Sequence, residues 1–119
     1  MGVLSEQIVH LIAKLEPEHD TNSALERLLE NEMIRRLNRY QFTDRTLRRK
    51  YGMSFPEFKD RGMVKEHGYS FEVESDFWDW EMALDGIETV EAMLTDLREI
   101  GRAYQRSSRY SGQSQLDLA

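Results

Sequence analysis

The sequence predicts a mainly α-helical fold, and three observations support this prediction. Apolar residues recur every three or four positions over most of the chain, which is the spacing of one helix face. A serine followed three residues later by glutamate, the capping box that starts helices, occurs twice. Charged residues make up 32% of the 119 residues, and no apolar run is long enough to cross a membrane. We therefore expect one helical domain over residues 1–104, followed by a flexible polar tail over 105–119.

The first forty residues predict an antiparallel hairpin of two helices. The first helix carries an apolar stripe at Leu4, Ile8, Leu11 and Leu15, with Ile12 beside it. Pro17 ends this helix because it has no amide donor and disfavours helical geometry at the residue before it. Ser23 and Glu26 form the capping box of the second helix, which we expect to run for about 18 residues to Tyr40.

A compact helical corner is expected next. Thr43 or Asp44 caps a third helix, which Gly52 ends in the left-handed conformation that glycine adopts readily. Ser54 and Glu57 form the second capping box, and this short fourth helix ends at Gly62.

Residues 69–74 predict the one β element of the fold. Tyr69, Phe71 and Val73 alternate with polar residues, and this period of two is typical of a half-buried strand. Because a lone strand leaves its backbone groups unpaired, it needs a partner strand. Met63–Lys65 is one candidate, and a strand from a second chain is the other.

A long C-terminal helix should complete the domain. Ser75 or Asp76 caps it, and its apolar face runs from Phe77 towards Tyr104. Gly86 lies in a pattern that resembles a new cap, so a break into two helices is expected there. Residues after Tyr104 lack apolar periodicity, which is why we assign them to the tail.

The net charge of −6 is distributed unevenly along the chain. Residues 1–34 and 51–99 are acidic, whereas residues 35–50 carry six arginines and one lysine against Asp44 alone. This basic patch suits nucleic acid, an acidic partner or the acidic C-terminal half of the same chain, the last being the simplest interpretation. The residues expected to contact nucleic acid are Arg45, Arg48, Arg49 and Lys50.

Few catalytic or cofactor chemistries fit the composition. The chain has no cysteine, which excludes disulfides, thiol catalysis and thiolate zinc sites. Its three histidines lack metal-ligand spacing, and Glu72, Asp76 and Asp79 lack the spacing of a calcium loop. We expect no metal and no cofactor. The N-terminus lacks the basic start of a secretory signal, so we expect a cytoplasmic location.

Arg61 and His67 have an Arg-x5-His spacing that resembles the catalytic pair of the HEPN ribonucleases. In that family pattern the arginine stabilises the scissile phosphate and the histidine moves protons. The structural alternative is that Arg61 is a cation at a helix C-terminus and that His67 is a turn residue.

Two tryptophans lie two positions apart in the segment Asp76–Glu81. On a helix they are about 200° apart, so they cannot both face the core. Trp80 continues the apolar face, and Trp78 therefore points to a second layer or to a partner. Large aromatics among acids suit an anchor for a basic protein. The predicted partner-binding residues are Asp76, Phe77, Trp78, Asp79, Trp80 and Glu81.

One segment resembles a known family. Residues 50–58 read Lys-Tyr-Gly-Met-Ser-Phe-Pro-Glu-Phe, and an acidic stretch with both tryptophans follows. This resembles the C-terminal, toxin-binding part of small prokaryotic antitoxins, and it is also similar to small proteins of cyanobacteria. The resemblance covers residues 45–95 and implies a non-enzymatic module that neutralises a basic, ribonuclease-type partner. Residues 1–42 differ from the DNA-binding heads that such antitoxins often carry.

The sequence is therefore compatible with three functions. The first is an antitoxin-like protein-binding module, the second an oligomeric nucleic-acid-associated protein that uses residues 35–50, and the third a HEPN-like ribonuclease. We also expect a homo-oligomer, because the helix faces and the unpaired strand are very apolar for a small monomer.

Overall fold

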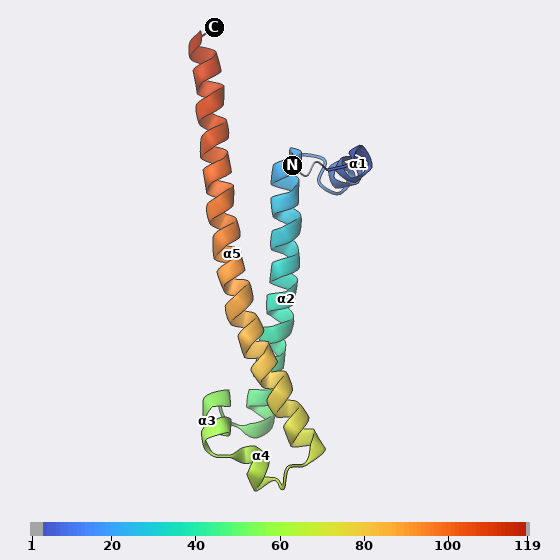
Figure 1. The fold of residues 1–119 in the computed structure, drawn as a ribbon, viewed down its shortest axis with the longest axis vertical. Coiled ribbons are helices and arrows are strands. Elements are labelled where there is room, and N and C mark those ends of the chain that lie inside the picture. The colour runs from blue at the N-terminus through green and yellow to red at the C-terminus, as the bar shows by residue number, and fades with distance from the viewer. Residues whose placement is uncertain (1–3, 119) are drawn as a thin grey trace. The chain divides into compact units, whose positions relative to one another are not determined.

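The computed structural model describes residues 4–118, which form five helices (Figure 1). Side chains are described over residues 4–107. The helices are α1 (Glu6–Leu15), α2 (Thr21–Tyr51), α3 (Phe55–Asp60), α4 (Met63–Glu66) and α5 (Phe71–Leu118). The mainly α-helical prediction and the long C-terminal helix are confirmed.

The chain divides into two compact units. Unit 1 comprises Met1–Met33 and Met93–Ala119, and unit 2 comprises Ile34–Ala92. The single domain over residues 1–104 and the flexible tail over 105–119 stay predictions, although α5 continues to Leu118.

The predicted strand over residues 69–74 is wrong, because the described residues contain no strand and α5 begins at Phe71. Ser70 explains the difference. Its hydroxyl accepts a hydrogen bond from the amide of Val73 at 3.3 Å, and its carbonyl accepts one from the amide of Glu74 at 3.0 Å. Ser70 is therefore the N-cap of α5, and acidic side chains in the first turn complement the helix dipole.

The proposed partner strand, Met63–Lys65, is also helical and belongs to α4. The amide of Tyr69 donates to the carbonyl of Val64 at 2.9 Å, and the amide of Gly68 donates to the carbonyl of Lys65 at 3.0 Å. This pair of bonds is a Schellman motif, which ends a helix with a left-handed residue, here Gly68 with a φ of 66°. This turn connects α4 to α5.

α2 is one helix of 31 residues where two were expected. Asp20 caps it instead of Ser23, because the Asp20 carboxylate accepts a hydrogen bond from the amide of Ser23 at 2.7 Å. Asp44, expected at a new cap, lies within α2 and accepts a hydrogen bond from the Trp80 indole at 2.8 Å. Gly52 ends the helix as expected, with a φ of 68°.

α3 begins at the predicted capping box. The hydroxyl of Ser54 accepts a hydrogen bond from the amide of Glu57 at 3.4 Å, and Pro56 lies in the first turn, where its missing amide costs nothing. The helix turns Phe55 and Phe58 inward, and both are buried.

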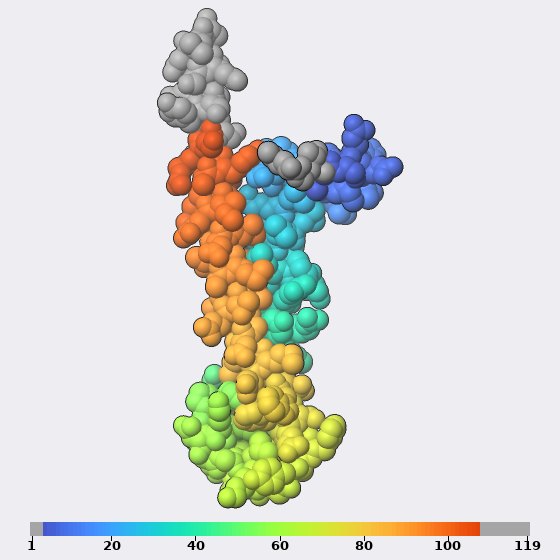
Figure 2. Space-filling model, viewed as in Figure 1, coloured from blue at the N-terminus to red at the C-terminus, as the bar shows by residue number. Residues whose placement is uncertain are grey.

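The core of unit 2 joins α2, α3, α4 and α5. Its buried residues are Leu47, Phe55, Phe58, Met63, Val73 and Trp80. The rings of Phe55 and Phe58 each lie 5.3 Å from the Trp80 ring, centroid to centroid. Figure 2 shows the green and yellow segments, which are α3, α4 and the start of α5, packed against one another.

Unit 1 has fewer large buried side chains. Ile12 is the buried residue of α1, and the Arg27 guanidinium donates to the Glu16 carboxylate at 3.0 Å. The Tyr104 hydroxyl donates to Asp20 at 3.2 Å. The predicted apolar stripe is exposed, both at Leu4, which lies before α1, and at Ile8, Leu11 and Leu15 within it. The antiparallel pairing of the first two helices stays a prediction.

α5 continues through Gly86, so the break expected there is wrong. A Cβ at this position would lie 2.5 Å from Cε2 of Tyr40. Glycine is needed here because the Tyr40 ring of α2 packs directly on the α5 backbone.

We predict that Gly86→Ala lowers the free energy of unfolding. The clash with the ring should cost about 1 to 3 kcal/mol, and better helix propensity recovers only about 1 kcal/mol of it. Gly101→Ala is the matched control, because its Cβ would meet only the flexible end of Glu26 and the propensity gain should dominate. Urea unfolding of both variants checks this. Equal shifts in the same direction would contradict the close approach.

Candidate functional site

The two tryptophans lie in opposite environments. Trp80 is 0% exposed, and its indole nitrogen donates to Asp44. Trp78 is 62% exposed, and its ring makes a T-shaped contact with the ring of Phe77, at 5.5 Å between centroids. Because α5 is helical here, burying Trp80 turns Trp78 outward, as the 200° separation predicts. Trp80 is therefore not accessible to a partner in this fold, whereas Trp78 is.

Trp78 is the centre of an exposed apolar strip on α5. Phe71 is 85% exposed and Met82 is 66% exposed. These residues lie seven positions before and four positions after Trp78, so all three share one helix face. Large exposed apolar groups gathered on one face indicate an interaction surface.

Carboxylates border this strip. Glu74, Glu81 and Asp85 lie four positions before, three after and seven after Trp78, which places them beside it on the helix. Among the residues whose side chains are described, none of the three has a basic group within 4 Å. We call this surface, comprising Phe71, Glu74, Trp78, Glu81, Met82 and Asp85, the Trp78 face.

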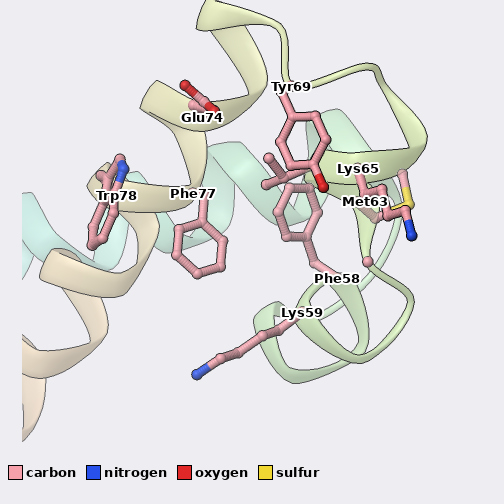
Figure 3. Close-up of a pocket in the computed structure, with 10 residues that line it drawn as sticks. Phe58, Lys59, Met63, Lys65, Tyr69, Glu74, Phe77 and Trp78 are labelled. Carbon is pink, nitrogen blue, oxygen red and sulfur yellow. The ribbon is translucent and has the colours of Figure 1, made fainter.

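A groove of about 400 Å³ lies on the other side of Trp78, towards α3 and α4 (Figure 3). Phe58 and Phe77 lie between Trp78 on one side and Tyr69 with Met63 on the other. Lys59, Lys65 and Glu74 are the charged residues of its lining. This mixture of charges does not favour an acidic or a basic occupant.

The remaining predicted contact residues have other roles. Asp76 accepts hydrogen bonds from Lys50 at 2.6 Å and from the Tyr51 hydroxyl at 2.5 Å, which ties the end of α2 to the start of α5. Phe77 is half-buried and packs on Phe55 at 5.4 Å. Asp79 faces α2 instead, beside Thr43, and lines two shallow hollows there.

This Asp76 cluster shifts two pKa values. Hydrogen bonds to Asp76 and Glu72 raise the pKa of Lys50. Burial, followed by the hydrogen bond to Asp76, raises the pKa of Tyr51 to about 12. Both shifts favour the protonated donors, so a charged lysine and a neutral phenol donate to one carboxylate.

The basic patch of residues 35–50 is partly neutralised within unit 2. Lys50 pairs with Glu72 as well as Asp76, so one residue of the patch meets the acidic C-terminal half of its own chain, as the simplest interpretation expects. Arg48 pairs with Asp44 at 3.5 Å. Of the four residues predicted to bind nucleic acid, only Arg45 and Arg49 lack an acidic partner among the described side chains.

Arg61 and His67 lie at the ends of two short helices, as expected if they have structural roles. Arg61 is the C-cap of α3, and His67 is the C-cap of α4, where its Nδ1 lies 2.9 Å from the carbonyl of Met63. Within the described residues, no group of three histidine, aspartate or glutamate side chains is placed to hold a metal ion. None of the described helices has an apolar stretch that would cross a bilayer.

Four residues of the Trp78 face were not predicted from the sequence, namely Phe71, Glu74, Met82 and Asp85. The signal was present in their spacing from Trp78, which matches one helix face in both directions. Because residues 69–74 were expected to form a strand, the helical spacing of Phe71 and Glu74 from Trp78 was not considered.

The chain matches no protein-family model, no curated protein and no solved structure. Its function is therefore inferred from the contacts described above.

We predict that the two tryptophans respond differently to acrylamide. The Trp78→Phe variant retains only the buried indole, so its emission should be blue-shifted and quenched several-fold less than the exposed component of the wild type. Steady-state and lifetime quenching measure this. Equal quenching of the wild type and Trp78→Phe would mean that Trp78 is not exposed.

We predict that Tyr51 stabilises the fold less at high pH. Its folded pKa is raised from 10.0 to about 12, so its contribution is complete below pH 10 and is lost as the pH rises towards 12. The difference in unfolding free energy between the wild type and Tyr51→Phe should therefore shrink over that range. Urea unfolding at a series of pH values tests it, and a difference independent of pH would contradict the hydrogen bond between Tyr51 and Asp76.

Proposed function

We propose that the chain is a non-enzymatic protein-binding module whose Trp78 face holds a basic partner. The observation that carries the proposal is the exposure of Trp78 within an apolar strip bordered by carboxylates that lack basic partners. Exposed tryptophan is a frequent anchor of protein interfaces because it buries a large area at little entropic cost. Its ring also attracts the cationic groups of a basic partner.

The charge of the surface determines which partner it fits. Three carboxylates around one aromatic strip attract lysine and arginine side chains and repel a polyanion. A basic helix with apolar residues at the same spacing would bury Phe71, Trp78 and Met82 while pairing with the acids. Such a partner fits an antitoxin-like role, in which the chain covers the basic, phosphate-binding surface of a ribonuclease-type toxin.

The family resemblance supports this role only in part. Tyr51 and Phe58 of the resembling motif lie in the core of unit 2, Gly52 ends α2, and Ser54 caps α3. These residues are explained by the helical corner that they build. The proposal therefore depends on the Trp78 face, and a cytoplasmic location stays part of it.

Nucleic-acid binding through residues 35–50 is the second candidate. Arg45 and Arg49 favour it, because both are exposed and Phe42 beside them is 65% exposed. Lys50 and Arg48 are engaged by acids of the same unit, which reduces the charge that a polyanion would meet.

Trp78→Ala should abolish capture of the partner. The tagged full-length chain would be used on a nuclease-treated lysate of the organism that encodes it, with mass spectrometry of the eluate. We expect the wild type to retain one stoichiometric basic protein, and Trp78→Ala to lose at least tenfold of it, as an interface hot spot does. Leu29→Ala, which shortens another exposed apolar residue, is the control and should retain it.

The antitoxin role has a separate test in cells. Expression of the captured protein alone should stop growth, and co-expression of the wild type, but not of Trp78→Ala, should restore it. Capture that is indifferent to Trp78→Ala, or no captured protein, would refute the proposal.

A further inference from the structure

Unit 2 carries a second exposed face whose charge is opposite to that of the Trp78 face. Phe42, Arg45 and Arg49 lie three and four positions apart on α2, so they share one side of that helix. All three are exposed, and neither arginine has an acidic group within 4 Å among the described side chains. We call this the Phe42 face.

The two faces are complementary in chemistry. The Phe42 face has one exposed aromatic side chain with two arginines beside it, and the Trp78 face has three exposed apolar side chains with three carboxylates beside them. Docking one on the other would bury aromatic area and pair arginines with carboxylates that have no ionic partner in the described chain. Both faces are exposed in a single copy, so neither covers the other within one chain.

We propose that a second copy of this chain occupies the Trp78 face and docks its Phe42 face there. Every copy carries one face of each kind, so two copies related by a two-fold axis make the contact twice. The chain thereby forms a reciprocal dimer.

The regulatory role of this dimer rests on the proposed function, because the second copy covers the surface assigned to the basic partner. The second copy and the partner then compete for Trp78. Self-association thus regulates the site, since the basic partner must displace the arginines of the other copy before it binds.

Charge reversal of each face tests the dimer by sedimentation velocity of the nuclease-treated full-length chain. We expect a wild-type dimer at low salt that weakens as salt rises, because exposed ion pairs are screened. Arg45→Glu with Arg49→Glu should be monomeric, and Glu81→Lys with Asp85→Lys should be monomeric as well. Circular dichroism of each variant verifies that it folds.

Mixing the two charge-reversed variants is the decisive step. Each then meets a partner face of opposite charge, so an equimolar mixture should recover the dimer although neither variant dimerises alone. Two controls carry the same changes in net charge outside both faces, Arg102→Glu with Arg106→Glu and Asp96→Lys with Glu99→Lys. Both controls should dimerise like the wild type.

Three results would overturn the inference. One is a wild type that stays monomeric at roughly 100 μM, well above the micromolar constants of weak interfaces. The second is a folded mixture that does not recover the dimer. The third is a monomeric wild type that binds RNA or DNA through Arg45 and Arg49, which would assign the Phe42 face to nucleic acid.

The dimer and the proposed function fail in different ways. If the chain is monomeric but still captures a basic protein through Trp78, only the dimer is refuted. If the dimer forms and no basic protein is captured, the Trp78 face is a homotypic interface and the proposed function is refuted.

Discussion

The structure of unit 2 depends on the burial of one indole ring, that of Trp80. The ring packs on Phe55 and Phe58 of α3, and its nitrogen donates to Asp44 of α2. A tryptophan can be fully buried at low cost only if its N–H finds an acceptor, because an unpaired buried donor costs about 1 to 3 kcal/mol. Asp44 supplies that acceptor, so α2, α3 and α5 are joined around a single side chain.

Because α5 is helical, the burial of Trp80 determines which residues form the exposed Trp78 face. Because Trp80 is buried, Trp78, two positions earlier, faces outward. Phe71 and Met82 lie on the same side of α5 and are exposed as well. The link from Lys50 and Tyr51 to Asp76 fixes the start of the same helix. It also pairs Lys50 of the basic patch with acids, whereas Arg45 and Arg49 have no acidic partner among the described side chains. The Asp76 cluster therefore holds the start of the helix that carries the Trp78 face, and it also pairs one cation of the basic patch with acids.

Much of the fold follows from local sequence signals, and the failures have physical causes. Gly52 and the Ser54 capping box end and start helices as expected, since their effects depend on neighbouring backbone groups alone. The alternation at residues 69–74 failed because the Ser70 cap and acidic first turn favour a helix, and only Val73 of the alternating set is buried. Asp44 and Gly86 were mistaken for helix breaks because their partners, Trp80 and Tyr40, are distant in sequence.

The candidate site was predictable to a similar degree. The 200° separation of the two tryptophans required only helical geometry, so the outward direction of Trp78 could be derived before any contact was known. The engagement of Asp76 and the turn of Asp79 towards α2 depend on tertiary packing, which spacing along one helix does not contain. Local pattern thus identified Trp78 as the exposed indole, and tertiary contacts determined which acids beside it have no ionic partner among the described residues.

The most direct test of this account is the pair of indole N–H signals in the NMR spectrum of the full-length chain. The Trp80 signal should exchange slowly with deuterium because its N–H is buried and bonded to Asp44, and the Trp78 signal should exchange fast. Adding an amphipathic peptide of arginine and leucine at helical spacing should shift the Trp78 signal and leave that of Trp80 in place. Similar exchange rates for both indoles, or a peptide-induced shift confined to Trp80, would contradict the claim that the buried Trp80 presents Trp78 as the binding anchor.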